Sequence, residues 1–86
     1  MKETERILKA LANRRRLAIL KFLDKKGKAS VGEIAQTIKL SFKATSKHLV
    51  ILAAVDLVDR EQAGLTMLYS LHAPYHSILK TVFTLL

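Results

Sequence analysis

The sequence predicts a mainly α-helical fold with one small β-hairpin. Apolar residues recur at three- and four-residue steps through much of the chain, as they do on the buried face of a helix. Serine, asparagine and proline stand where helices would begin, and two short runs of branched and aromatic residues flank a turn that contains Gly64. Because 86 residues are the size of one small domain, we assign residues 1–86 to a single domain.

The N-terminal part of the chain predicts two helices that meet at Asn13. The first helix covers residues 5–12 and has one apolar face. Asn13 is a favourable cap for the second helix, which begins at Arg14 and is closed by Gly27.

Two further helices are expected in the middle of the chain. Ser30 and Glu33 predict a capping box at the start of the first, which ends near Ile38. Ser41 caps the second, which covers residues 42–55. The turn between them is short and the second helix opens with small and cationic residues. The pair is therefore a candidate helix-turn-helix, a motif whose second helix enters the DNA major groove.

A β-hairpin and a final helix are expected after this motif. Residues 57–60 and 66–71 predict the two strands, and residues 61–64 predict the turn between them. A hairpin directly after a helix-turn-helix gives the element order α-α-α-α-β-β-α of a winged helix-turn-helix. Pro74 is well placed to start the last helix, which extends toward Leu86.

The composition favours a polyanionic partner and excludes several kinds of site. Fifteen Lys and Arg against seven Asp and Glu leave a net charge of +8, and residues 1–28, with ten basic and three acidic residues, hold +7 of it. Because there is no cysteine, disulfides and thiolate metal sites are excluded. No apolar run approaches the roughly 20 residues of a membrane span, so we expect a cytoplasmic protein that does not bind membranes. Scattered carboxylates and the lack of a Gly-rich phosphate loop predict neither an enzyme nor a bound cofactor.

Several segments match the pattern of a known family in the expected order. They are LKALANRRRLAIL at residues 8–20, EIA at 33–35, SKHL at 46–49 with Leu52, and LV at 57–58 leading to LYSL at 68–71. On these segments the chain resembles the ArsR family of small bacterial and archaeal repressors. The resemblance implies a homodimeric winged helix-turn-helix that binds inverted-repeat double-stranded DNA and acts as a transcriptional repressor.

The residues expected to contact DNA lie on the second helix of the motif, at the start of the helix after Asn13, and on the hairpin. They are Ser41, Lys43, Ala44, Thr45, Lys47, His48, Arg14, Arg15, Arg60 and Gln62. The lysines can reach guanine acceptors or phosphate, and Ala44 can pack on a thymine methyl group. Phe42 opens the same helix and either touches thymine methyl groups or packs back as core, which is the interpretation that we favour.

Two departures from the family pattern bear on this prediction. The first junction usually reads Asp-Pro-x-Arg in the family and here reads Asn13-Arg14-Arg15-Arg16. Its first two arginines either contact phosphate or serve as solvated surface, whereas Arg16 is expected to pair internally with a carboxylate. Asp56 replaces the glycine of the usual corner after the recognition helix, and aspartate tolerates the left-handed backbone that such a corner needs.

The two terminal helices, at residues 3–12 and 74–86, are the expected dimerisation elements. Half of all residues are apolar, which is high for a chain of this size and suggests burial against a second copy. In the resembling family the terminal helices of two chains meet across a two-fold axis. The expected interface residues are Ile7, Leu8, Leu11, Ile78, Leu79, Val82, Phe83 and Leu86.

Two other functions stay open at this point. The later half of the motif's second helix is apolar nearly all round, so Val50, Ala53 and Ala54 would suit a protein-interaction module with an unidentified protein partner. The other alternative is a histidine-based metal sensor. Only His72 and His76, four residues apart, are available to it, and we therefore expect no metal site.

Overall fold

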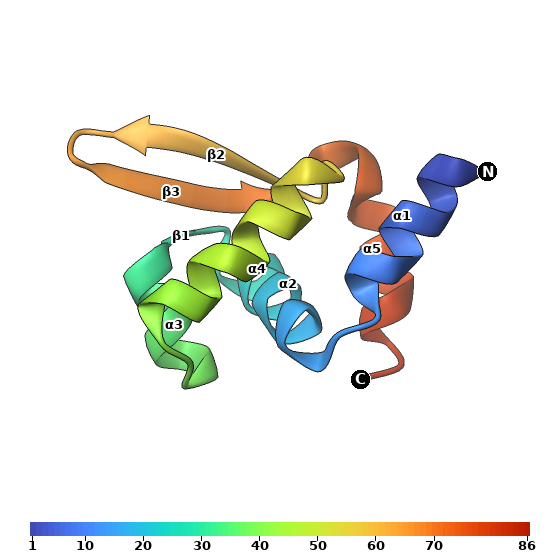
Figure 1. The fold of residues 1–86 in the computed structure, drawn as a ribbon, viewed down its shortest axis with the longest axis horizontal. Helices are drawn as coiled ribbons and strands as arrows, with labels where there is room; N and C mark the ends of the chain where they lie inside the picture. Colours follow the sequence, from blue (N-terminus) through green and yellow to red (C-terminus); the bar gives the residue numbers. More distant parts are fainter.

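The computed structural model contains the helices and the hairpin that the sequence predicts (Figure 1). It describes the backbone of residues 1–86 and the side chains of residues 1–74 and 77–86. The α-helices are α1 (Lys2–Leu11), α2 (Arg14–Lys26), α3 (Val31–Ile38), α4 (Phe42–Ala54) and α5 (His76–Phe83), with a 3₁₀ turn, η1 (Ala73–Tyr75), before α5. The strands are β1 (Lys28–Ser30), β2 (Val58–Ala63) and β3 (Thr66–Leu71). The mainly α architecture is therefore confirmed, although Pro74 lies in the 3₁₀ turn and not in the final α-helix.

Side-chain caps determine where three of the helices begin. The Oδ1 atom of Asn13 accepts hydrogen bonds from two backbone N–H groups in the first turn of α2, at 2.9 and 3.1 Å. Ser30 and Glu33 form a reciprocal capping box at the start of α3. The Oγ atom of Ser41 accepts from the N–H of Ala44 at 3.1 Å. Each cap satisfies donors that the helix leaves free and contributes about 1 kcal/mol, so the three predicted helix starts are confirmed.

Two non-glycine residues adopt left-handed backbone conformations next to the helices of the motif. Lys39 has φ 57° and caps the C-terminus of α3, while Asp56 has φ 56° and follows α4. Short polar side chains tolerate this region better than most, because they can form local hydrogen bonds. The prediction that the corner after α4 survives with Asp56 in place of glycine is confirmed.

The sheet has one strand more than the sequence predicts. Its strand order is β1-β3-β2, and β1 pairs antiparallel with β3 so that Ala29 lies opposite Tyr69. The hairpin is also longer than expected, because residues 61–63 continue β2 and pair with β3. A two-residue turn at Gly64 and Leu65 replaces the predicted four-residue turn, and Gly64 supplies the positive φ of 64° that such a turn needs.

One hydrophobic core joins the helices to the sheet. Its largest fully buried side chains are Ile19, Leu20, Leu23, Ile34, Thr45, Leu49, Leu52, Leu57 and Leu79. Leu11 is only 7% exposed and belongs to the same core. Leu11 and Leu79, which we expected at a dimer interface, therefore pack within their own chain, and the dimer prediction loses these two residues.

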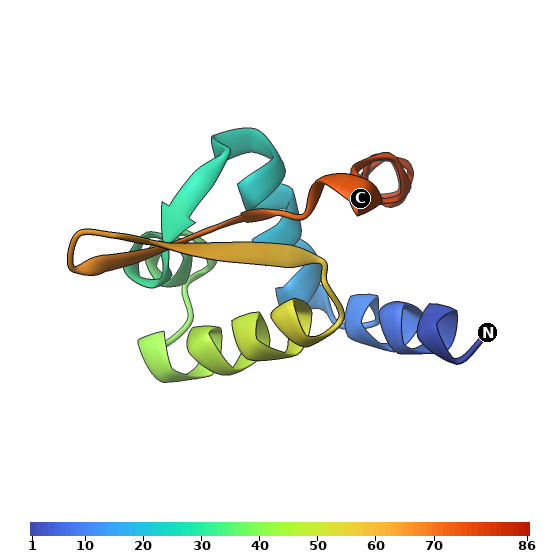
Figure 2. The same cartoon turned by 90° about the horizontal axis from the view of Figure 1, so that it is seen from above.

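The hairpin and the two chain termini lie at opposite ends of the molecule, whose longest extent is 37 Å (Figure 2). Strands β2 and β3 extend to one end, and α1 and α5 lie at the other. Helix α4 runs along one side between these ends, with its N-terminus beside α3. None of the helices in the described part of the chain is long and apolar enough to cross a membrane.

Candidate nucleic-acid interface

The first two turns of α4 form an exposed, positively charged surface. Lys43 and Lys47 are exposed, and neither takes part in a salt bridge with another described residue. Ser41 is exposed at the N-terminus of the helix, while Ala44 and His48 are half-buried beside the lysines. These five of the predicted contact residues thus lie together on one accessible stretch of a helix, where a duplex can reach them.

Thr45 is the exception among the α4 residues that we expected to contact DNA. Its side chain is fully buried, and its Oγ1 atom donates a hydrogen bond to the backbone carbonyl of Ser41 at 2.8 Å. A group with no exposed surface cannot touch a duplex. Thr45 therefore belongs to the core of the motif and leaves the set of contact residues, because helical periodicity directs it inward between Leu49 and the first turn.

Phe42 is exposed, which contradicts the expectation that it packs in the core. Its relative exposed area is 62%. It borders a shallow hollow of about 420 Å³ that also touches Val31, Leu65 and Met67, so it lies between the start of α3 and the tip of the hairpin. The ring is held in place by the helix but is not covered by the described part of the chain.

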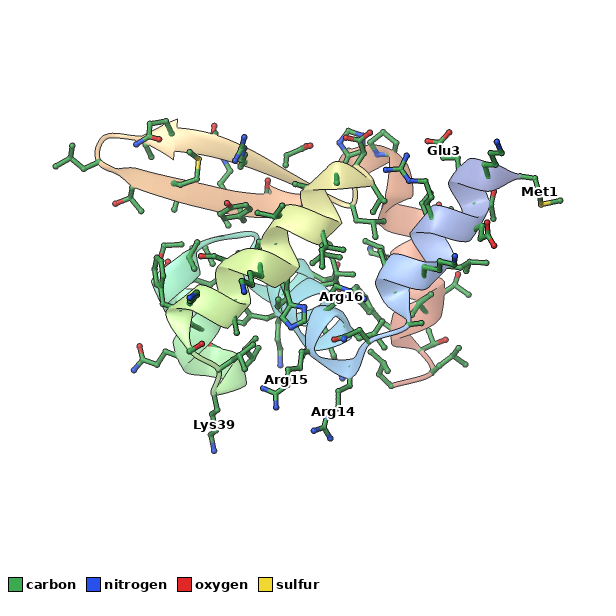
Figure 3. All side chains as sticks on the ribbon, viewed as in Figure 1. Met1, Glu3, Arg14, Arg15, Arg16 and Lys39 are labelled. Carbon is green, nitrogen blue, oxygen red and sulfur yellow. The ribbon has the colours of Figure 1, made fainter. Side chains whose placement is uncertain are left out.

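A second group of cations extends the positive surface from α4 to α2 and α3. Arg14, Arg15 and Lys39 line a hollow of about 300 Å³ together with Ala18 and Ile38. Figure 3 shows the three cationic side chains projecting from the same side of the molecule. Sequence reasoning missed Lys39. Its position in the turn of the motif, two residues before the Ser41 cap of the recognition helix, was the available signal.

Arg16 connects α1 to α4 through hydrogen bonds and not through the carboxylate pair that we expected. Its Nε atom donates to the carbonyl of Ala10 at 2.6 Å, and one of its terminal nitrogens lies 3.4 Å from Nδ1 of His48. Another donates to the carbonyl of Lys9 at 3.4 Å. Two carbonyls in the last turn of α1 thus take the place of the carboxylate, since a helix C-terminus carries partial negative charge.

Burial and the neighbouring arginines favour the neutral form of His48. Partial burial lowers the pKa of His48, and the positive charges of Arg16 and Arg15 lower it further. A neutral imidazole accepts from Arg16 at Nδ1, so its proton lies on Nε2. His48 therefore presents a neutral donor beside the lysines of α4.

The hairpin carries the two remaining predicted contact residues. Arg60 and Gln62 are both exposed on β2, and the amide of Gln62 donates to the carbonyl of Gly64 at 2.9 Å. Glu61, which would repel phosphate, forms a salt bridge with Lys28 of β1. This pairing offsets the negative charge between Arg60 and Gln62, so the hairpin is more compatible with an anionic partner than its sequence indicates.

The histidine-based metal site gains no support among the described residues. Nδ1 of His72 lies 2.8 Å from a carboxylate oxygen of Asp59, and His76 lies outside the residues whose side chains are described. Within the described part of the chain, no group of three His, Cys, Asp or Glu side chains could hold a metal ion.

Apart from Phe42 and Leu65, the large exposed apolar side chains lie on the terminal segments and on the later half of α4. On the terminal segments Leu8, Ile78 and Leu86 are 60%, 49% and 55% exposed, while Ile7, Val82 and Phe83 are partly buried against the core. Leu8 lines a hollow of about 560 Å³ along α1. On α4, Val50 is 62% exposed, Ala54 is exposed and Ala53 is half-buried. These two surfaces are the ones predicted for dimerisation and for a protein partner.

Comparison with known proteins gives one family and several close structural relatives. A family of helix-turn-helix domains matches residues 6–61. The transcriptional activator HlyU of Vibrio cholerae is 42% identical over 66 residues, which cover 76% of this chain and 59% of HlyU. This chain thus spans less than two thirds of that relative's length.

Solved structures match nearly the whole chain. Reduced HlyU from Vibrio cholerae superposes with a TM-score of 0.86 at 34% identity, covering 98% of this chain and 88% of HlyU. Mb0332 from Mycobacterium bovis, described as a homodimeric winged helix-turn-helix DNA-binding domain and a possible ArsR-family regulator, has a TM-score of 0.90 at 28% identity over 98% of this chain and 78% of its own. The transcriptional repressor PagR of Bacillus anthracis has a TM-score of 0.84 at 29% identity, covering 94% and 93%.

Proposed function

This chain belongs to the helix-turn-helix domain family, among the ArsR-type winged helix-turn-helix regulators, and from that membership we propose that it binds double-stranded DNA as a homodimer and regulates transcription. Residues 1–86 act as one DNA-binding domain in this proposal. It requires no catalytic group, metal or cofactor. Its partners are the DNA duplex and a second copy of the chain.

The observation that carries the proposal is the accessible cationic surface of α4. Lys43 and Lys47 are exposed on the first turns of a helix that follows a short capped turn. In helix-turn-helix proteins the N-terminal residues of this second helix contact base edges in the major groove. Two copies related by a two-fold axis would insert their α4 helices into successive major grooves, about 34 Å apart, on an inverted repeat.

Phosphate contacts would supply most of the affinity. Arg14, Arg15 and Lys39 extend the cationic surface to one side of α4, and Ser41 and the neutral donor of His48 add hydrogen bonds. Each cation that meets a phosphate releases a condensed counterion, so binding should weaken steeply with salt. On the hairpin, Arg60 and Gln62 would contact flanking phosphates or the minor groove.

The second copy would pack against the terminal helices. Leu8, Ile78 and Leu86 are large apolar side chains that one chain leaves exposed at the end of the molecule opposite the hairpin. Large apolar side chains that one chain leaves exposed are enriched at subunit interfaces. Mb0332 is described as a homodimer, and this supports the same assembly here.

We propose repression as the direction of regulation. A repressor needs only to occupy its site, whereas an activator must also contact the transcription machinery. PagR is named a repressor and HlyU an activator, so the relatives allow either direction. The exposed apolar surface of Val50 and Ala54 is where an activating protein contact, or the alternative protein-interaction function, would act.

The test is selection of duplexes from a mixed DNA library at two salt concentrations. The wild-type chain should bind more weakly at the higher salt. Lys43→Ala/Lys47→Ala removes two lysines from each subunit of the dimer and should lower the slope of log affinity against log salt by about 3.6, at about 0.9 per lost phosphate contact. Lys25→Ala/Lys26→Ala is the matched control. It removes the same charge from the exposed far end of α2.

The control variant should retain the wild-type slope. If it loses as much affinity as the α4 variant, the contacts reflect net charge and not α4. If no duplex binds even at low salt, DNA binding is excluded, and the surface of Val50 and Ala54 becomes the site to examine for a protein partner.

A further inference from the structure

We propose that this protein recognises its DNA half-site chiefly through the 5-methyl groups of thymine, and that Phe42 is the side chain that contacts them. This inference rests on the proposed DNA binding and names the base feature that α4 selects. Three properties of α4 support it: the exposure of Phe42, the lack of side chains that match other base edges, and the internal use of its hydroxyl groups.

Phe42 is the first residue of α4 and projects a large apolar group from the end of the helix that would approach base edges. It is 62% exposed, although a phenylalanine ring strongly favours burial. Lys43 and Lys47 lie on the same two turns and would bring the polyanion to this surface. Charge complementarity therefore selects DNA as the group that covers the ring. Among the four bases, thymine alone offers an apolar group in the major groove.

The remaining side chains of α4 cannot distinguish most base edges. The helix has the sequence FKATSKHLVILAA, which contains no arginine, asparagine, glutamine, aspartate or glutamate. It therefore lacks the carboxamides that pair with adenine and the carboxylates that accept from cytosine. Lys43, Lys47 and the Nε2–H of His48 can donate to guanine or to thymine O4, but a single donor does not separate these acceptors well.

The hydroxyl groups at the start of α4 are engaged within the helix. Ser41 accepts the N–H of Ala44 at 3.1 Å, and Thr45 donates to the carbonyl of Ser41 at 2.8 Å while fully buried. Thr45 is therefore unavailable to a base edge, and Ser41 can offer only its O–H while its oxygen caps the helix. The apolar surface of Phe42, next to half-buried Ala44, is thus the most discriminating feature that this end of the helix offers.

Removal of one methyl group from the DNA gives the expected size of the effect. Burial of a methyl-sized group stabilises a complex enough to change affinity about fourfold. Deoxyuridine differs from thymidine by this methyl group alone and keeps the same hydrogen-bonding edge. A thymine read by Phe42 should therefore lose about fourfold in affinity when it is replaced by uracil, and thymines outside the contact should lose nothing.

The experiment uses duplexes selected by the wild-type chain from a random library. Each thymine of a selected half-site is replaced in turn by deoxyuridine, and dissociation constants are measured for the wild type, Phe42→Ala and Val50→Ala. Val50 is the matched control, because it is also 62% exposed on α4 but lies two turns further along. We expect one or two sensitive thymines per half-site with the wild type and with Val50→Ala, and none with Phe42→Ala.

The outcomes separate this inference from the proposed function. If the library yields no bound duplex, DNA binding itself fails. If duplexes bind but every uracil substitution is neutral, thymine methyl recognition is overturned while DNA binding stands. If Phe42→Ala keeps the same sensitive thymines, the methyl groups act through DNA shape or another side chain, and the assignment to Phe42 is overturned.

Discussion

The inner faces of α3 and α4 are buried within one chain, whereas the outer face of α4, with Phe42 and Val50, and the terminal helices leave large apolar side chains in contact with solvent. Ile34 of α3 and Leu52 of α4 are fully buried. Leu8 of α1 and Ile78 of α5 are 60% and 49% exposed. One chain thus completes the core of the motif, while the exposed apolar residues of the terminal helices are the ones that we propose a second copy covers. Stability of the motif and dimerisation should therefore respond to different substitutions.

The largest expected effect is the loss of stability caused by a cavity in the core of the helix-turn-helix. Leu52→Ala removes a fully buried side chain and leaves a cavity, so it should lower the free energy of unfolding by about 2–5 kcal/mol. Leu8→Ala should act mainly through dimerisation, and its cost should therefore depend on protein concentration. Urea unfolding at several protein concentrations measures both. An effect of Leu8→Ala that is as large as that of Leu52→Ala and independent of concentration would show that α1 completes its packing within one chain.

The second effect concerns association. Leu8→Lys/Ile78→Lys places two charges on the exposed apolar surface of α1 and α5, and it should weaken the dimer by at least about 100-fold, since central apolar residues of an interface contribute on the order of 2 kcal/mol or more. Sedimentation equilibrium measures the dissociation constant. Leu65→Lys is the control, because Leu65 is fully exposed at the opposite end, in the turn of the hairpin. Loss of the dimer in the control but not in the double variant would place the interface on the hairpin.

The starts of three helices could be predicted from local sequence signals. The features that were not predicted, such as strand β1, depend on contacts between distant parts of the chain. Asn13, Ser30 and Ser41 are recognisable from the sequence as helix caps. The side chain of each cap accepts a hydrogen bond from a backbone N–H no more than three residues later, so the signal is local. The three-residue strand β1 has no such signal, since it forms only by pairing with β3, about 40 residues later. The two strands of the hairpin were predicted from their branched and aromatic residues, but the predicted turn began too early. Glu61 is compatible with either a strand or a loop, and in the structure it extends β2.

The exposure of the predicted contact residues also depends on tertiary packing and was not fully predicted from the sequence. Phe42 and Thr45 are three residues apart on one helix, and from the sequence we favoured a buried ring for Phe42 and included Thr45 among the residues that contact DNA. The structure has the reverse arrangement, because the helix directs position 45 toward the core and position 42 toward solvent. Lys39 was overlooked for a related reason: its role depends on α2 lying beside the turn, which brings it to Arg14 and Arg15.

A smaller effect, on the salt dependence of DNA binding, tests whether Lys39 contacts DNA together with Arg14 and Arg15. Lys39→Asn removes the charge but keeps a residue that tolerates φ 57°, so the turn should survive. The slope of log affinity against log salt should fall by about 1.8, the value expected for one phosphate contact in each subunit of the dimer. Lys25→Gln on the far end of α2 should leave the slope unchanged. Equal slopes for the wild type and Lys39→Asn would exclude a phosphate contact at the turn.

The two regions meet at Arg16, which donates to α1 through the carbonyl of Ala10 and reaches α4 through Nδ1 of His48. This contact needs a neutral imidazole, because a protonated ring would offer Nδ1 as a second donor facing a cation. The lowered pKa of His48 also favours the neutral imidazole. Arg16 thereby joins the helix that we assign to dimerisation to the helix that we assign to DNA contact.

The smallest expected effect is the pH dependence of this contact. Because the folded chain holds the pKa of His48 below the usual 6.5, the unfolded chain binds more protons there, and stability should fall as the pH drops below about 6.5 toward the lowered value. His48→Gln removes the titrating group, so urea midpoints between about pH 7.5 and about pH 5.5 should change less than those of the wild type. Glu33, whose pKa is lowered by its hydrogen bonds to Ser30, titrates below 4.5 and lies outside this window.

Arg16→Gln should move the pKa of His48 back toward its usual value in an NMR titration, because it removes one neighbouring positive charge. An unchanged pKa in Arg16→Gln would mean that burial alone sets the state of His48, and that the contact between α1 and α4 has no electrostatic part.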